Sequence, residues 1–280
     1  MHGSVLTLLQ AAGLAVAGLG AGFLAGLVGV GGGVIFTPVL FALYGVLGVP
    51  EAVRTPLTVG TGLFCTGLAA GASAIHHERQ GAVRPRMALG VGLASAGAVG
   101  LVSAFVVTQP WYDSSVFQLL FAAVLLVVVA RMVRGPAAEG ASASEGPDLP
   151  PWLAWIGTGT AAGTVASAVG VGGGVVLVPA YSRLLRLPFP QAVGTSSATI
   201  LVISALSTIA YAGLGAGVVA QPFALGYVDV GTGLLLAGPA VLGAQGGAAL
   251  AHRVETAWLR WSFAVLAVVV AGRLVWNALA

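Results

Sequence analysis

Two copies of one glycine-rich sequence are the part of this chain with the clearest chemical potential. The sequence GVGGG occupies Gly29–Gly33 and again Gly170–Gly174, each time inside a long uncharged stretch. Three consecutive glycines destabilise a helix by roughly 1 kcal/mol each relative to alanine, so we expect a helix break at both places. A helix that restarts after a break presents free N–H groups with partial positive charge, and such groups bind anions. The expected donors of an anion site are the last three glycines of each copy: Gly31, Gly32, Gly33, Gly172, Gly173 and Gly174.

Hydroxyl and guanidinium groups follow the glycine copies and could complete this site. Thr195, Ser196 and Ser197 begin the helix expected after the second copy, where hydroxyls cap a helix or donate to an anion. In the first half, Thr55 matches Thr195 and directly follows Arg54. A guanidinium at Arg54 would attract an anion into an outward-facing vestibule.

Simpler structural roles stay open for these residues at the level of sequence. The glycines could serve solely to pack the two arms of a hairpin against each other. Arg54 could lie at the membrane interface, paired with Glu51. Gln245, the other polar candidate inside a span, could form a hydrogen bond between helices instead of contacting a substrate.

The sequence lacks the patterns that mark other classes of function. All eight acidic residues lie in expected loops or at span ends, so no span carries a central carboxylate for a cation site or a proton relay. No nucleophile–base pair, P-loop or nucleotide fingerprint is present. We therefore expect no enzymatic activity, no catalytic residues, no metal, no cofactor and no nucleic-acid partner.

Composition predicts the fold class in which these residues must be positioned. Of the 280 residues, 58% are hydrophobic and 7% are charged, and the mean hydropathy is +1.01. A soluble domain carries roughly 25% charged residues. Several uncharged runs also exceed the roughly 18 apolar residues that mark a membrane-spanning helix. We expect an all-α polytopic membrane protein in a lipid bilayer; an oligomer is compatible with the sequence but is not indicated.

The chain is expected to contain two repeats. Residues 18–38 match residues 159–179 at 12 of 21 positions. We expect a first membrane repeat at 1–134, a flexible linker at 135–151 and a second membrane repeat at 152–280.

Small residues four apart precede each glycine copy. Gly18, Gly22 and Gly26 form one such ladder, and Gly159 and Gly163 begin the matching one. Spacing of this kind lets membrane helices approach closely, so the ladders are expected to pack helices and not to bind a ligand.

Arginine placement predicts that the two repeats have opposite orientations. The chain has 11 arginines and no lysine. The loop His76–Arg86 holds three arginines and is expected to be cytoplasmic, whereas its counterpart at 213–229 has none. Equivalent loops on opposite sides require an odd number of crossings per repeat, which is an inverted-topology repeat typical of transporters. The linker is then cytoplasmic, both termini lie outside, and Arg54 and Arg273 are the two arginines left outside.

Run lengths predict the segments of each repeat. Trp152–Ser182 holds 31 uncharged residues. Without the five residues of GVGGG, 26 remain, or 13 for each of two helical arms. An arm of 13 residues is about 20 Å long, which is less than the roughly 30 Å thickness of the hydrocarbon core. The arms are therefore expected to form a re-entrant or broken helix pair with its tip inside the membrane. Three transmembrane helices complete each repeat, which gives about 8–10 membrane segments. The expected spans are 57–76, 87–108, 115–133, 193–214, 229–251 and 257–277.

The glycine copies and the residues that follow them resemble the TauE/SafE family of sulfite exporters. Each GVGGG copy is followed by a proline and then by an A-V-x-T stretch, Ala52–Thr55 or Ala192–Thr195. The later GYVD sequence, Gly226–Asp229, is similar to that family as well, and the resemblance covers about residues 10–277. The resemblance implies a multi-pass transporter of small oxyanions in the bacterial inner (plasma) membrane.

The same resemblance implies export of sulfite, or of an organosulfonate such as sulfoacetate, by alternating access of the two repeats. The first half departs from the pattern, because Arg54 stands where the second half has Gly194. Two alternatives stay open. One is a permease for another small inorganic or organic anion, including an importer; the other is a non-transporting membrane scaffold in which the glycines only pack helices.

Overall fold

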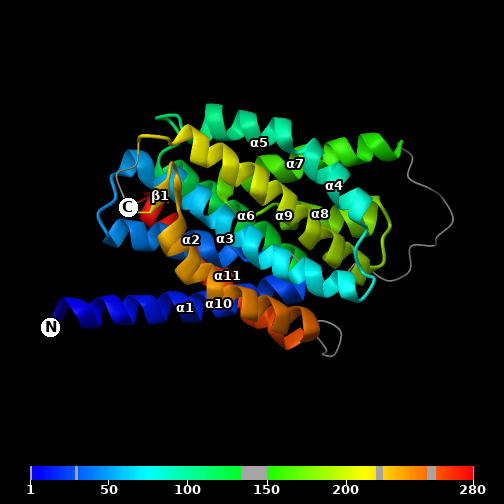
Figure 1. Ribbon diagram of the computed structural model, residues 1–280, viewed down its shortest axis with the longest axis horizontal. Helices are drawn as coiled ribbons and strands as arrows, with labels where there is room; N and C mark the ends of the chain where they lie inside the picture. Colours follow the sequence, from blue (N-terminus) through cyan, green and yellow to red (C-terminus); the bar gives the residue numbers. More distant parts are fainter. Residues whose placement is uncertain (1, 29–30, 134–149, 219–222, 251–256, 280) are drawn as a thin grey trace.

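A computed structural model confirms the all-helical class, with helix ends on either side of both glycine copies (Figure 1). It describes residues 2–28, 31–133, 150–218, 223–250 and 257–279. In chain order the helices are α1 (His2–Val28), α2 (Gly33–Val46), α3 (Glu51–Arg79), α4 (Pro85–Ala94), α5 (Ala96–Val102), the π-helical turn η1 (Ser103–Val107), α6 (Ser114–Val133), α7 (Pro151–Val169), α8 (Gly174–Pro179), the π-helical turn η2 (Ala180–Leu184), α9 (Phe189–Leu214), α10 (Val230–Leu250) and α11 (Ala257–Leu279). Two short antiparallel strands, β1 (Ala224–Leu225) and β2 (Val228–Asp229), precede α10.

The expected spans correspond to helices. In the described part of the chain, four helical segments are long and apolar enough to cross a membrane: Glu51–Arg79, Pro85–Val107, Phe189–Leu214 and Val230–Leu250. Each of them covers one expected span, and α6 and α11 cover the other two. The chain is therefore a multi-pass helical membrane protein. Most of the linker expected at 135–151 lies outside the described residues.

The two helices around each glycine copy have unequal lengths. Helix α1 has 27 residues and α7 has 19, or about 40 and 28 Å of helix. After the breaks, α2 has 14 residues, and α8 has 6 residues followed by 5 in η2. The equal arms expected for the second half are not found, because the glycine copy does not lie midway in its uncharged run. Only the second helix of each pair is much shorter than a membrane span.

The glycine ladders pack helices, as predicted. A Cβ atom on Gly18, Gly22 or Gly26 of α1 would collide with a backbone carbonyl of α10. In the second half, a Cβ atom on Gly159 of α7 would collide with the carbonyl oxygen of Val91 in α4, and one on Gly163 would lie 3.0 Å from the carbonyl oxygen of Ser95, between α4 and α5. Such close approach is possible only without a side chain.

Equivalent helices of the two halves pack against each other. Helix α3 packs against α9 (Figure 1), and the contacts between residues show that α6 packs against α11. Likewise, α1 packs on α10 while its counterpart α7 packs on α4 and α5. Helices α3 and α9 run antiparallel, since Gly60 contacts Tyr211 near one end and Ser73 contacts Ser197 near the other. This pair forms the part of the fold against which the glycine breaks lie.

Candidate functional site

The two glycine breaks meet inside the molecule. A Cβ atom on Gly33 would lie 2.5 Å from the carbonyl oxygen of Gly170 and 2.7 Å from the Cα of Val171. Gly31 and Gly172 occupy equivalent positions and both adopt left-handed backbone conformations, with φ of 80° and 83°. Residues other than glycine rarely adopt this backbone conformation. The two copies therefore form one structural unit, although they are 141 residues apart in sequence.

Thr66 of α3 and Ile200 of α9 lie between the two breaks. The Cγ2 atom of Thr66 would lie 3.1 Å from a Cβ on Gly31 and 2.6 Å from a Cβ on Gly172. Methyl groups of Ile200 would lie 3.6 and 3.1 Å from the same two positions. Both side chains are fully buried. The two breaks and the α3–α9 pair therefore converge on one place.

Hydrogen-bond donors without partners collect at this place. The hydroxyls of Thr66 and Ser204 are buried and have no hydrogen-bond partner among the described residues, and Ser204 lies one helical turn after Ile200. Within the described residues, no carbonyl accepts a hydrogen bond from the buried N–H groups of Gly172, Gly173 and Gly174. A buried polar group left unpaired costs about 1–3 kcal/mol. A ligand with several acceptor oxygens would remove that cost.

The acceptors beside these donors are already occupied. Three hydroxyls donate to carbonyl oxygens at the end of α7: Tyr211 to Ser167 at 2.6 Å, Tyr112 to Ala168 at 2.9 Å and Thr37 to Gly170 at 3.0 Å. The place between the breaks therefore offers donors and few acceptors. This arrangement suits an anion and does not suit a cation.

The predicted hydroxyls of Thr195, Ser196 and Ser197 lie further along α9. All three residues are buried. The Thr195 hydroxyl accepts a backbone N–H from the loop between α3 and α4 at 3.1 Å, and the Ser197 hydroxyl lies 3.1 Å from that of Ser73. On α3, Ser73 is seven residues from Thr66, or about 10 Å of helix. These hydroxyls therefore lie beside the end of α3 and not between the breaks.

A row of buried hydroxyls connects the two places along the α3–α9 interface. Its members are Thr55, Thr58, Thr66 and Ser73 on α3, and Ser197, Ser204 and Ser207 on α9. Their spacing of three, seven or eight residues puts each set on one face of its helix. This spacing is visible in the sequence and would have identified Thr66 and Ser204, which the glycine motif alone does not.

Arg54 and Gln245 lie away from the breaks. The guanidinium carbon of Arg54 is 5.7 Å from the ring centre of Phe41. Glu51 is exposed and forms no ion pair with Arg54 among the described residues. Gln245 is exposed on α10, whereas its neighbour Ala244 is buried against α1. Neither side chain contributes to the place where the breaks meet.

Asp229 belongs to a buried polar network that the sequence patterns did not indicate. Its carboxylate accepts from the Tyr44 hydroxyl at 3.3 Å and from the backbone N–H of Thr232 at 3.0 Å. Its own N–H donates to the Thr61 hydroxyl at 2.9 Å. These bonds cap the start of α10 and connect it to α2 and α3.

Comparisons with known proteins place the chain in a family. The family described as Sulfite exporter TauE/SafE matches residues 14–274. A probable membrane transporter protein of Methanocaldococcus jannaschii is 26% identical over 247 residues, which is 88% of each chain. A probable membrane transporter protein of Haemophilus influenzae is 27% identical over 256 residues, 90% of this chain and 92% of the relative. No solved structure is significantly similar to the chain. The chain therefore belongs to the sulfite exporter TauE/SafE family and is a multi-pass membrane transporter.

Proposed function

We propose that this transporter exports a small sulfur-containing anion, sulfite or an organosulfonate such as sulfoacetate, across the bacterial inner membrane. The observation that carries the proposal is the meeting of the two glycine breaks beside Thr66, a buried residue whose hydroxyl has no hydrogen-bond partner among the described residues. Backbone N–H groups of Gly172–Gly174 and the Ser204 hydroxyl add further donors. A sulfite or sulfonate group has several oxygens that could accept hydrogen bonds from donors of this kind.

Alternating access of two inverted repeats is the mechanism that we propose. The antiparallel α3–α9 pair and the α6–α11 pair, each made of equivalent helices, support a two-fold relation between the repeats. In such transporters the substrate lies between the repeats and is opened to either side as one repeat rocks against the other. In this arrangement the linker is cytoplasmic and both termini lie outside.

The membrane potential supplies the driving force in this proposal. An inside-negative potential favours outward movement of an anion by about 2.3 kcal/mol per charge per 100 mV. The donors between the breaks are backbone N–H and hydroxyl groups, and Asp229, the buried acid found among the described residues, is engaged in capping α10. We therefore propose uncoupled, electrogenic efflux.

Replacing the unpartnered hydroxyls tests this proposal. Thr66→Val keeps the shape of the side chain, and the lost hydroxyl has no partner in the part of the chain that the structure describes, so the free energy of unfolding should not fall. Efflux of sulfite or sulfoacetate from proteoliposomes should fall about tenfold, which corresponds to one lost hydrogen bond of roughly 1.4 kcal/mol. Ser204→Ala should behave in the same way.

Thr158→Val is the matched control. Thr158 is also a buried threonine with an unpartnered hydroxyl, but it lies on α7 twelve residues before Gly170, about 18 Å of helix from the break. This variant should transport at the wild-type rate. Wild-type efflux in both Thr66→Val and Ser204→Ala would overturn the proposed site. Thermal stabilisation of the purified protein by sulfite, thiosulfate, sulfoacetate or taurine identifies the preferred anion.

A further inference from the structure

A hollow lies between two loops that come from different repeats. Its volume is about 470 Å³, and its walls are residues 80–82, which follow α3, and residues 188–191, where α9 begins. Both loops are expected to be cytoplasmic. Ser197, a member of the row of buried hydroxyls, lies six residues after Gln191, or about 9 Å along α9. The hollow therefore lies beside the cytoplasmic end of the row.

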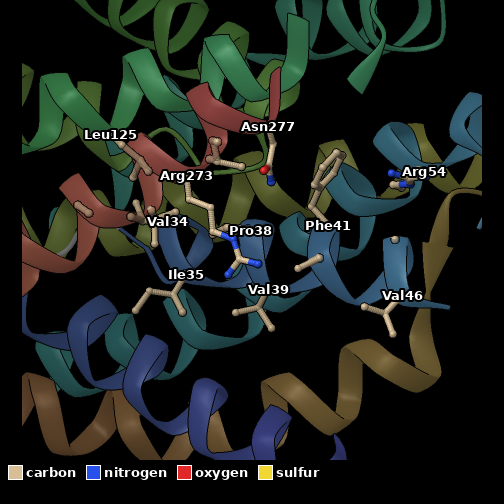
Figure 2. Close-up of a pocket in the computed structure, with 15 residues that line it drawn as sticks. Val34, Ile35, Pro38, Val39, Phe41, Val46, Arg54, Leu125, Arg273 and Asn277 are labelled. Atoms are coloured by element: carbon tan, nitrogen blue, oxygen red, sulfur yellow. The ribbon is translucent and has the colours of Figure 1, made fainter. Parts of the chain in front are cut away.

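The larger cavity along α2 has a different character (Figure 2). Its volume is about 570 Å³, and Figure 2 shows aliphatic side chains such as Val34, Ile35 and Val39 along its wall. Among the described residues, none of the hydroxyls of the row lines it. The hollow at the start of α9, and not this cavity, adjoins the row.

The loop after α3 covers the end of the row. A Cβ atom on Gly194 of α9 would collide with the carbonyl oxygen of Ala82, and Ala82 is buried. The backbone N–H of Arg84 donates to the Thr195 hydroxyl at 3.1 Å. Ser197, on the next turn of α9, is buried as well. An anion in the hollow can therefore reach the row only after this loop moves away from α9.

An exposed hydrogen bond between side chains also joins this loop to α9. The Nε atom of Arg84 donates to the side-chain oxygen of Gln191 at 3.1 Å, and Arg84 is exposed. Water can replace either partner of such a bond, so its net contribution is small. The connection can therefore open at low cost.

The equivalent loop of the second repeat is held more firmly. Its residues 226–229 pack on α3, where the backbone N–H of Asp229 donates to the Thr61 hydroxyl at 2.9 Å. A Cβ atom on Gly60 would collide with the carbonyl oxygen of Tyr227. Asp229, Thr61 and Tyr227 are all buried. Opening one end of the α3–α9 pair therefore costs less at the loop after α3.

Charge at this end of the molecule favours the approach of an anion. Segments 76–86 and 183–191 hold one acid, Glu78, and five exposed arginines: Arg79, Arg84, Arg86, Arg183 and Arg186. A guanidinium binds an oxyanion through two parallel hydrogen bonds between opposite charges, whereas the amide of Gln191 offers one neutral oxygen. An oxyanion in the hollow therefore competes with Gln191 for Arg84.

We propose that residues 80–84 form the cytoplasmic gate of the transporter, and that the gate opens when a small oxyanion replaces Gln191 as the partner of Arg84. The loop then moves off Gly194 and Thr195, and the anion passes to Ser197 and along the row of hydroxyls to the glycine breaks. The inference rests on the proposed function and deepens it, because it names the residues that control access to the site from the cytoplasm.

Labelling of a cysteine placed in the row measures gate opening without any transported anion. Full-length protein carries Cys65→Ser, which removes its one cysteine, together with Ser73→Cys or, as a second reporter, Ser197→Cys. Sulfonatoethyl methanethiosulfonate, a membrane-impermeant anion, is added to the cytoplasmic face of inside-out vesicles. Gln191→Ala should accelerate labelling about fivefold, which corresponds to the loss of one exposed hydrogen bond.

Gln80→Ala is the matched control for this labelling. Gln80 lines the same hollow, but its amide is bonded to His76 of its own helix at 2.9 Å and not to α9. Labelling in this variant should proceed at the background rate.

Transport kinetics separate opening of the gate from capture of the anion. Both Arg84→Ala and Gln191→Ala remove the bond between the two side chains, so both should accelerate labelling, but only Arg84→Ala removes a charge. The KM for sulfoacetate at the cytoplasmic face should rise about fivefold in Arg84→Ala, since an exposed ion pair contributes about that much, and should not rise in Gln191→Ala. Arg86→Ala removes a neighbouring exposed charge and should keep the wild-type KM.

Two results would overturn the inference. One is labelling of both reporters at the background rate in Gln191→Ala and Arg84→Ala. The other is a wild-type KM in Arg84→Ala, or an equal rise in Arg86→Ala, which would leave these arginines only a general effect of surface charge. Failure of the proposed function is a separate outcome, since it appears as wild-type efflux in Thr66→Val and Ser204→Ala and does not alter the labelling rates.

Discussion

Thr37 and Thr66 are buried threonines next to the same glycine breaks, but their hydroxyls differ in hydrogen bonding. The Thr37 hydroxyl donates to the carbonyl of Gly170, whereas the Thr66 hydroxyl has no partner within the described ranges. Thr37→Val leaves that buried carbonyl unpaired and should lower the free energy of unfolding by about 1–3 kcal/mol. Thermal unfolding in detergent measures the difference. Thr66→Val should show no such loss, and equal stability of the two variants would contradict the assigned hydrogen bond.

The glycine positions could be predicted from sequence, but the residues that meet them could not. Consecutive glycines are unfavourable in any helix, so the breaks at Gly31 and Gly172 follow from local chemistry. The position of Thr66 between them depends on how α3 crosses α9, which no local pattern specifies. Thr195 illustrates the same limit, because its hydroxyl is bonded to the loop after α3.

Helix α1 offers a test of packing at the scale of an element. A Cβ on Gly22 would collide with the backbone of Ala240 in α10, whereas a Cβ on Gly20 would meet no atom within 4 Å. Gly22→Ala should therefore destabilise the protein by about 1–3 kcal/mol. Gly20→Ala changes the same residue type on the same helix and should be neutral or slightly stabilising. Thermal unfolding compares the stability of the two variants. Wild-type stability of Gly22→Ala would mean that α1 and α10 lie further apart than the structure shows.

The sequence predicted where helices occur better than it predicted how long they are. The six expected spans coincide with helices, because long apolar runs in a membrane protein must satisfy their backbone hydrogen bonds within helices. The unequal arms around each glycine copy were not predicted, because the limits of an uncharged run are not the limits of a helix. The interruption between α4 and α5 at Ser95 lies in an uncharged run that was expected to form one continuous span.

At the scale of the whole molecule, the two halves are joined through their equivalent helices. Helix α3 lies antiparallel to α9, and α6 packs against α11, so any movement of one repeat displaces the surface of the other. The glycine breaks lie against the α3–α9 pair, where such movement would change their surroundings. Duplication was visible in the sequence because the glycine copies are nearly identical, whereas the contact between the repeats required the structure.

The dependence of efflux on membrane potential tests the central claim most directly. Proteoliposomes loaded with sulfite or sulfoacetate are clamped at defined potentials with potassium and valinomycin, and anion efflux is followed with and without a proton gradient. An uncoupled anion exporter should move net charge, and an inside-negative potential of about 100 mV should raise the outside-to-inside ratio at equilibrium about 50-fold per charge. Thr66→Val should reduce this current, while Thr158→Val should leave it unchanged. Efflux that is electroneutral, or that requires an imposed proton gradient, would contradict the account.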